Sequence, residues 1–126
     1  MVKKKQRKVL IVEDHNVSLI LMKDLLADTN YACDLACNGN MAESMLNKYK
    51  YDIVLMDLLL PDINGIEIIK NFRSVNNETF VIAVTAFPKA EMEKACMSAG
   101  FDEYISKPFN IEELYEKMEL SQHKYH

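Results

Sequence analysis

The sequence has few residues of the kinds that disulfide-rich, zinc-binding or disordered proteins require. Its 126 residues include only three cysteines, three glycines and three prolines. Cys33, Cys37 and Cys96 are odd in number and lack a C-x-x-C spacing, which excludes a disulfide framework and a zinc site. With 49% hydrophobic and 27% charged residues, the composition indicates a single globular domain rich in helix formers.

The sequence also lacks an excess of positive charge and any long hydrophobic run. Its formal net charge of −4 argues against binding to nucleic acid. The basic cluster of Lys3, Lys4, Lys5, Arg7 and Lys8 is interpreted as a solvated lead-in. Only about four apolar residues follow it, which is too few for a signal peptide or a membrane span. We therefore expect a cytoplasmic protein, a monomer or weak dimer, that binds neither nucleic acid nor membrane.

Five short apolar runs alternate with segments of helical periodicity. Two of them, 9–12 and 53–56, are unbroken, rich in β-branched residues and bounded by charge, as is typical of strands buried in a parallel sheet. The others cover 32–36, which is a weaker strand pattern, 80–84 and 104–106. Strict alternation of strand and helix predicts an α/β fold, a doubly wound parallel sheet in the order 2-1-3-4-5 with helices on both faces. The expected domain is 8–120, between a lead-in at 1–7 and a tail at 121–126.

Helical spacing of apolar residues predicts which helix faces pack on the sheet. In the first helix, expected at 16–28, the predicted inward residues are Val17, Ile20, Leu21 and Leu25. In the other helices they are Met41, Met45, Leu46 and Tyr49; Ile66, Ile69 and Phe72; Met92, Ala95, Cys96 and Ala99; and Ile111, Leu114 and Met118. Pro88 and Gly100 are expected to bracket the fourth helix.

Chemically active residues follow the predicted strands. Glu13 and Asp14 end the first run and Asp57 ends the third, while Thr85 and Lys107 end the fourth and fifth. Strands one and three are neighbours at the point where the winding reverses, so the three carboxylates should meet there. Because carboxylates that converge repel one another unless a cation neutralises them, and because all the ligands are oxygens, Mg²⁺ is favoured over Ca²⁺.

The same residues suggest phosphoryl chemistry. Asp57 has the traits of a nucleophile that forms an aspartyl phosphate beside a metal ion. Lys107 can pair with the phosphoryl oxygens, and the Thr85 hydroxyl can donate a hydrogen bond to one of them. The sequence therefore predicts Asp57, Thr85 and Lys107 as catalytic residues.

Four stretches, VLIVEDHN, DIVLMDLLLPDINGIE, VIAVTAF and YISKPFN, resemble the signature segments of bacterial response-regulator receiver domains, which are CheY-like in fold. The resemblance covers essentially 8–120. It implies that Asp57 is the phosphoacceptor and that the ligands of Mg²⁺ are Glu13, directly or through water, Asp14, Asp57 and the backbone carbonyl of Leu59. It further implies a switch formed by Thr85 and Tyr104, and a cis peptide bond between Lys107 and Pro108.

The resemblance also implies partners. The phosphodonor would be a phosphohistidine on a sensor histidine kinase or histidine phosphotransfer protein, docking near the first helix. The face formed by the fourth helix, fifth strand and fifth helix would signal to a downstream protein. VEDHN, VTAF and SKPFN most resemble single-domain phosphorelay and cell-cycle receivers of the DivK type, which indicates a stand-alone signalling switch and not an enzyme.

Two positions differ from common family patterns. His15 stands where Asn or Asp is frequent; it either tunes the acidic pocket or merely begins the first helix. Leu59 and Phe87 are apolar where fast-hydrolysing relatives place polar groups, which suggests slow loss of phosphate.

Two other classes of protein share part of this pattern. A phosphohydrolase of the haloacid dehalogenase type also forms an aspartyl phosphate, but it needs a second acid at the position of Leu59. A flavodoxin-like electron carrier needs a phosphate-binding loop after the first strand, where this chain has acidic residues.

Overall fold

The computed structural model describes residues 6–123, so Lys3, Lys4 and Lys5 of the basic cluster and the end of the expected tail lie outside the described residues. The strands are β1 (Arg7–Val12), β2 (Tyr31–Ala36), β3 (Ile53–Met56), β4 (Phe80–Thr85) and β5 (Glu103–Ser106). The helices are α1 (Asn16–Leu25), α2 (Gly39–Lys48), α3 (Gly65–Arg73), α4 (Lys89–Ala99), α5 (Ile111–Glu119) and the short 3₁₀ helix η1 (Leu120–His123).

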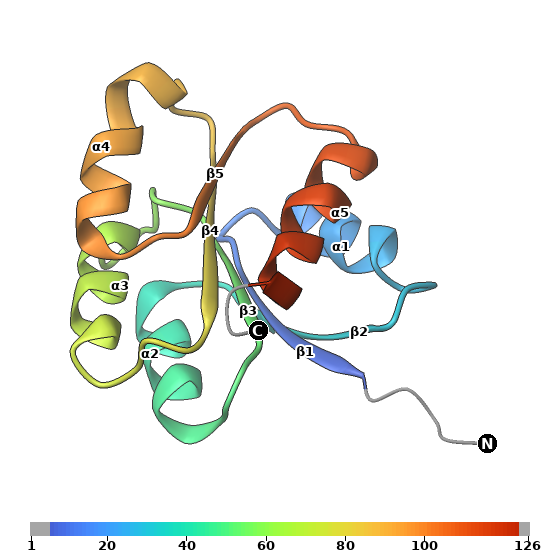
Figure 1. Ribbon diagram of the computed structural model, residues 1–126, viewed down its shortest axis with the longest axis horizontal. Helices are drawn as coiled ribbons and strands as arrows, with labels where there is room; N and C mark the ends of the chain where they lie inside the picture. Colours follow the sequence, from blue (N-terminus) through green and yellow to red (C-terminus); the bar gives the residue numbers. More distant parts are fainter. Residues whose placement is uncertain (1–5, 124–126) are drawn as a thin grey trace.

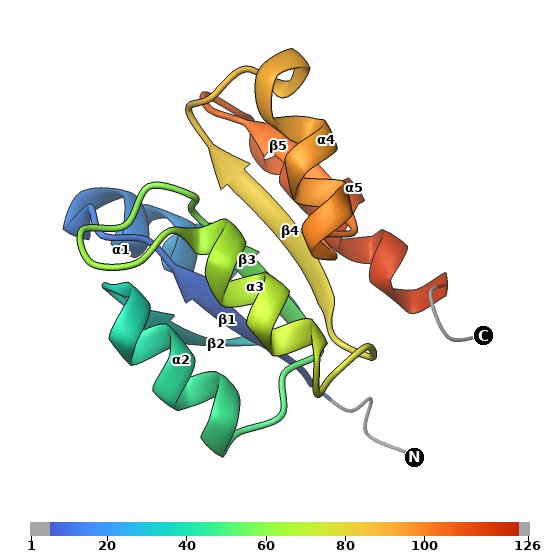
Figure 2. The ribbon, with the colours of Figure 1, turned by 90° about the vertical axis from the view of Figure 1, so that its left-hand side faces the viewer.

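The five strands form one parallel sheet in the order β2-β1-β3-β4-β5. Helices α2, α3 and α4 cover one face of this sheet, and α1 and α5 cover the other (Figures 1 and 2). The predicted doubly wound α/β fold and its strand order are therefore confirmed. None of the helices in the described part of the chain is long and apolar enough to cross a membrane.

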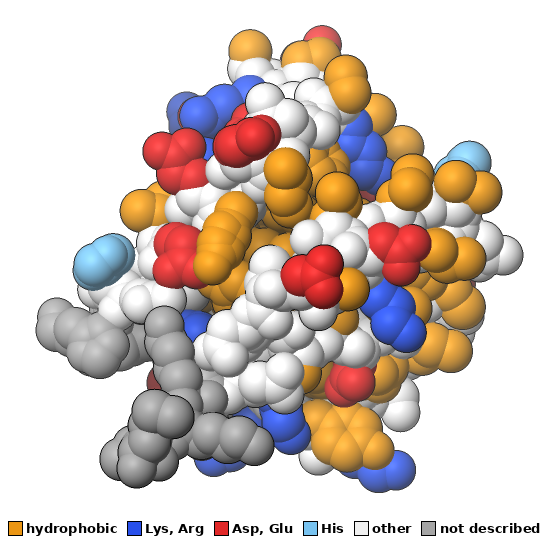
Figure 3. Space-filling view, turned by 90° about the vertical axis from the view of Figure 1, so that its right-hand side faces the viewer, with side chains coloured by type: hydrophobic (Ala, Val, Ile, Leu, Met, Phe, Trp, Pro, Cys, Tyr) orange, Lys and Arg blue, Asp and Glu red, His pale blue; other side chains and the backbone are white. Residues whose placement is uncertain are grey.

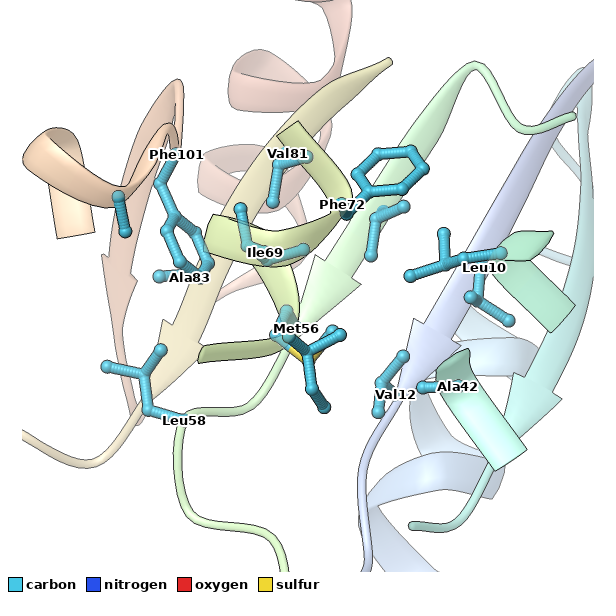
Figure 4. Packing of buried hydrophobic residues seen from close by; sticks show 14 of the residues in the cluster. Leu10, Val12, Ala42, Met56, Leu58, Ile69, Phe72, Val81, Ala83 and Phe101 are labelled. Carbon is cyan, nitrogen blue, oxygen red and sulfur yellow. The ribbon is translucent and has the colours of Figure 1, made fainter. Parts of the chain in front are cut away.

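Alternate residues of each strand enter two separate hydrophobic cores. Leu10 and Val12 of β1 belong to the core under α2, α3 and α4, while Val9 and Ile11 belong to the core under α1 and α5. Figure 4 shows the first core, where Ile69 and Phe72 of α3 lie over the strands. Since both faces are covered, the central strands β3 and β4 are buried along their whole length and do not alternate between apolar and polar residues.

The predicted inward face of α1 is wrong. Val17, Ile20, Leu21 and Leu25 are 69%, 55%, 57% and 43% exposed, whereas Leu19 and Met22 of α1, with Leu26 just beyond it, are buried. Both sets of residues have helical spacing, because the helix is apolar on most of its circumference. Figure 3 views the side that carries α1 and α5 and shows hydrophobic side chains at the surface there.

The helix also ends earlier than the expected position 28. Its last residue is Leu25, and the chain then turns, with the backbone N–H and the hydroxyl of Thr29 both donating to the carbonyl of Leu26. These bonds take the carbonyl that a continuing helix would have used for a later N–H. Asp28 therefore lies in the turn that leads to β2.

The prediction of which residues face inward is correct only in part for α2 and for α4. Leu46 is buried and Met45 half-buried, but Met41 and Tyr49 are exposed. The small residue Ala42 occupies the inward position instead, and Tyr49 lies past the end of α2.

In α4, Cys96 and Ala99 are buried and Met92 is half-buried, while Ala95 is exposed. The predicted end of α4 is confirmed, since Gly100 follows its last residue with a left-handed φ of 111°. Pro88, expected at the first helical position, is instead the residue just before the helix, which begins at Lys89. The predicted inward residues of α3 and α5 are buried or half-buried.

Candidate functional site

Three carboxylates meet at the carboxyl ends of β1 and β3. Glu13, Asp14 and Asp57 each offer an oxygen atom, and these atoms lie within 4.8 Å of one another. The backbone fixes two of them, because the N–H of Glu13 donates to the carbonyl of Ala36 and the N–H of Asp57 donates to the carbonyl of Val12, both at 3.0 Å. The convergence follows from the pairing of β1 with β3, as the strand order predicts.

Lys107, just after β5, brings a positive charge to the carboxylates. Its Nζ lies 3.1 and 3.0 Å from the two carboxylate oxygens of Glu13 and 3.4 Å from Oδ2 of Asp57. Its own N–H donates to the carbonyl of Thr85 at 2.7 Å, and the peptide bond to Pro108 is cis, as expected from the resemblance. One ammonium group thus faces two buried carboxylates.

Burial divides the carboxylates into two kinds. Glu13 and Asp57 are only 2% and 8% exposed, whereas Asp14 is exposed to solvent. The pKa of Glu13 is raised from 4.5 to about 7, mainly by burial and next by the hydrogen bond with Asp57, while Lys107 acts in the opposite direction. Burial therefore disfavours a negative charge on Glu13 unless a cation lies beside it.

The donor set fits a hard divalent cation such as Mg²⁺. The cluster offers carboxylate oxygens and no sulfur or imidazole ligand. Because Asp14 is exposed, an ion held there could keep several water molecules and still contact the two buried groups. Leu59, expected to supply a backbone carbonyl, lies in the loop after β3, and its N–H donates to Oδ1 of Asp57 at 3.1 Å.

Thr85 and Tyr104 both bond to the backbone of Phe87. Thr85 is fully buried, and its hydroxyl oxygen accepts a hydrogen bond from the N–H of Phe87 at 3.4 Å. Tyr104 is also buried, and its hydroxyl donates to the carbonyl of Phe87 at 2.7 Å. Burial raises the pKa of Tyr104 to about 12, so its hydroxyl is a hydrogen-bond donor at neutral pH.

Gly65 was not identified as part of the site from the sequence, where it served only as a turn signal. A Cβ atom at this residue would lie 2.5 Å from the backbone oxygen of Asp57, so only glycine permits this approach of α3 to the end of β3. The backbone of Phe87 was missed too, because a main-chain contact leaves no mark in the side-chain pattern.

A family comparison and curated relatives agree on the class of this domain. Residues 9–119 match the family described as the response regulator receiver domain. The response regulator ArlR of Staphylococcus saprophyticus is 38% identical over 107 residues, which are 85% of this chain and 48% of ArlR. The transcriptional regulatory protein DltR of Streptococcus agalactiae is 34% identical over 90% of this chain and 50% of DltR, so the chain spans about half the length of these relatives.

Solved structures show the same architecture. A response-regulator receiver domain from Francisella has a TM-score of 0.89 and 26% identity, covering 96% of this chain and 100% of that one. The receiver domain of a sensor histidine kinase from Pseudomonas aeruginosa, described with a magnesium ion coordinated in its active site cleft, has a TM-score of 0.83 and 28% identity over 90% of this chain and 95% of that one. Together with the family match, these likenesses show that the chain belongs to the response-regulator receiver domain family.

Proposed function

We propose that Asp57 accepts a phosphoryl group from a phosphohistidine donor and that the resulting aspartyl phosphate switches the surface read by a partner protein. The observation that carries this proposal is the meeting of Glu13, Asp14 and Asp57 within 4.8 Å, with the Lys107 ammonium 3.4 Å from Asp57. Receiver domains act as signalling switches in two-component systems, and this geometry provides what such a switch needs.

The residues that would hold Mg²⁺ are Asp14, Asp57, the backbone carbonyl of Leu59 and Glu13, the last directly or through water. When bound, the ion would neutralise charge on the carboxylates and on the incoming phosphoryl oxygens. Two of the carboxylates are buried and one is exposed, which gives the site both a low-dielectric interior and access to solvent.

The side chain of Asp57 would attack phosphorus. A phosphorus–oxygen bond forms at its carboxylate while the phosphorus–nitrogen bond to the donor breaks, and the electron pair of that bond returns to the imidazole, which takes up a proton. Lys107 would pair with a phosphoryl oxygen, since its ammonium already lies beside the carboxylate of Asp57. The hydroxyl of Thr85 would donate a hydrogen bond to another phosphoryl oxygen.

The switch would run through Thr85 and Tyr104. A movement of Thr85 toward the phosphoryl group would disturb the backbone of Phe87, to which Tyr104 also bonds. Tyr104 lies on β5, between α4 and α5, so a change there would alter the α4-β5-α5 face. That face is the proposed contact surface for a downstream protein.

The exposed apolar face of α1, formed by Val17, Ile20, Leu21 and Leu25, is the proposed docking surface for the phosphodonor. It begins three residues after Asp14, next to the carboxylates. A sensor histidine kinase or histidine phosphotransfer protein would bring its phosphohistidine over this face. We further infer a role in a cytoplasmic phosphorelay or cell-cycle pathway, as a monomer or weak dimer.

The test is phosphorylation of the purified protein by a small phosphodonor with Mg²⁺, followed by intact mass. Wild type should gain the mass of one phosphoryl group, and Asp57→Asn should gain none. Asp28→Asn is a matched control, because Asp28 is an exposed aspartate in the turn after α1. Equal labelling of wild type and Asp57→Asn would overturn the proposal.

No observation favours a phosphohydrolase, and Leu59 occupies the position of the second acid that it would need.

A further inference from the structure

Asp62 joins the loop after Asp57 to the beginning of α2. Its Oδ1 accepts hydrogen bonds from the N–H groups of Gly39 at 2.8 Å and Ile63 at 3.0 Å, and its Oδ2 accepts from the N–H of Asn40 at 2.9 Å. Gly39 and Asn40 are the first two residues of α2. Figure 2 shows the β3–α3 loop, which carries Asp62, beside the start of this helix.

Two side chains share the N–H groups at the start of α2. Asn38, the residue before the helix, accepts from the N–H of Met41 at 2.8 Å, while Asp62 takes the two N–H groups before it. These groups have no partner within the helix itself, and they favour a negative charge. Asn38 directly precedes α2 in the chain, whereas Asp62 reaches α2 from the loop that follows Asp57.

The β3–α3 loop is held at two places, at its base by contacts that include the N–H of Leu59 and at its exposed end by Asp62, and the carbonyl of Leu59 follows the base contact along the chain. At its base, the N–H of Leu59 donates to Asp57 at 3.1 Å and the N–H of Gly65 donates to the carbonyl of Leu58 at 3.0 Å. At its exposed end, Asp62 binds α2. Leu59 itself is 59% exposed, so its side chain adds little packing that would keep the loop in place.

Gly39 permits the contact by having no side chain. A Cβ atom there would lie 2.9 Å from Cβ of Ile63 and 3.0 Å from Oδ1 of Asp62. Of the described residues, only Gly100 has a positive φ, so Gly39 is required for the close approach and not for its backbone conformation. The N–H groups of Asn40 and Gly39 also lower the pKa of Asp62, which keeps its carboxylate charged at neutral pH.

We propose that Asp62 is a positioning residue that fixes the β3–α3 loop to α2, and thereby holds the backbone carbonyl of Leu59 where the proposed Mg²⁺ site needs it. The inference rests on the proposed function. It assigns to α2 a part in metal binding although, in the described structure, no α2 residue belongs to the carboxylate cluster. Outer residues that orient metal ligands commonly change metal affinity by about tenfold or more when removed.

The experiment measures the Mg²⁺ dissociation constant of the full chain by calorimetry and, separately, its thermal unfolding. Asp62→Ala should weaken Mg²⁺ binding on the order of tenfold, and Asp62→Asn, which keeps one acceptor oxygen, should weaken it less. Gly39→Ala should weaken it as well, by pushing Ile63 and Asp62 away. Asn38→Ala is the matched control: it removes a hydrogen bond from the same helix end, and should lower the melting temperature while Mg²⁺ affinity stays that of wild type.

A reciprocal measurement separates positioning from mere stabilisation. If Asp62 positions a metal ligand, bound Mg²⁺ must in turn strengthen the contact, because the coupling between two sites acts equally in both directions. Amide hydrogen exchange at Gly39 and Asn40 should therefore slow when Mg²⁺ is added to wild type, and should not respond in Asp14→Asn.

Wild-type Mg²⁺ affinity in Asp62→Ala, or exchange at Gly39 and Asn40 that ignores Mg²⁺, would overturn the inference and leave the proposed function intact. Failure of wild type to bind Mg²⁺ at all would overturn both.

Discussion

The hydroxyl of Tyr104 donates a hydrogen bond of 2.7 Å to the backbone carbonyl of Phe87, the residue whose N–H donates to the hydroxyl of Thr85. The proposed switch residues are therefore connected through one residue of the loop between β4 and α4. The two hydrogen bonds give the proposed phosphorylation site a connection to the ring of Tyr104 by way of this loop.

Tyr104→Phe should lower the free energy of unfolding by about 1 kcal/mol, because it removes this hydrogen bond from a buried position. Phosphorylation of Asp57 should proceed as in wild type, since Tyr104 does not bond to the carboxylates. Urea denaturation and labelling with a phosphodonor measure the two quantities. Tyr49→Phe serves as the control, because Tyr49 is 48% exposed and its loss should change neither. A failure of Tyr104→Phe to accept phosphate would contradict the assigned role.

Lys107→Met should separate metal binding from phosphoryl transfer. Removing the ammonium 3.0 Å from Glu13 and 3.4 Å from Asp57 leaves the carboxylates more negative, so Mg²⁺ should bind at least as tightly as in wild type. Phosphorylation should slow, because the cation that pairs with the phosphoryl oxygens is gone. Calorimetry and labelling rates measure the two effects. Weaker Mg²⁺ binding together with unchanged labelling would be the opposite of this expectation.

The stability conferred by Mg²⁺ should increase with pH. Burial raises the pKa of Glu13 to about 7 in the folded state, above the ordinary value of 4.5 that it has when unfolded. A raised acid pKa means that the folded state binds the proton more tightly, so the stabilising effect of this proton is complete below pH 4.5 and is lost as the pH rises through 7. Above that range the charged Glu13 favours a cation.

Melting temperatures with Mg²⁺ and with a chelator, taken at about pH 6 and about pH 8, test this dependence. The increment due to Mg²⁺ should be larger at the higher pH. In Glu13→Gln, which cannot titrate, the two increments should approach each other. Equal increments in wild type would show that Glu13 does not titrate in this range.

Arg73 should contribute more to stability than any exposed ion pair of the described structure. Its guanidinium donates to the carbonyls of Gly100 and Asn76 at 2.8 and 3.3 Å, and to Asp102 at 2.9 Å, with only 11% of the side chain exposed. It thereby ties the end of α3 to the segment between α4 and β5. Arg73→Ala should lower the free energy of unfolding by about 2 to 4 kcal/mol, because the partly buried carboxylate of Asp102 loses its ion pair and two carbonyls each lose a hydrogen bond.

Lys89→Ala is the control for this prediction. Lys89 pairs with Glu93 at 3.1 Å, but the two side chains are 56% and 45% exposed. Such a pair is worth about 0.5 kcal/mol or less. Similar losses in Arg73→Ala and Lys89→Ala, measured by urea denaturation, would refute the distinction.

The sequence predicted the sheet and the meeting of the carboxylates better than it predicted the helix faces. Strands buried on both sides are recognisable as unbroken apolar runs, and the strand order then places Asp57 beside Asp14. In α1, however, Leu21 is exposed and Met22 is buried although both are apolar and lie only about 100° apart around the helix, and periodicity alone could not decide which of them faces the core. The contact of Asp62 with α2 joins residues far apart in the sequence, so no local pattern could reveal it.

The phosphoryl group on Asp57 should be lost slowly. Hydrolysis needs a water molecule held in line with the phosphorus–oxygen bond, and a polar side chain near the site would hold it. Leu59, 59% exposed, lies two residues after Asp57, and Phe87, half-buried, lies two residues after Thr85; neither side chain can form a hydrogen bond to water. The half-life of the labelled protein after removal of the donor should therefore be minutes or longer, and Leu59→Asn should shorten it on the order of tenfold.

Leu120→Asn, at an exposed residue of η1, should leave the half-life unchanged. Decay of wild type within seconds would show that another group orients the water, and His15, exposed directly after Asp14, would be the first to replace.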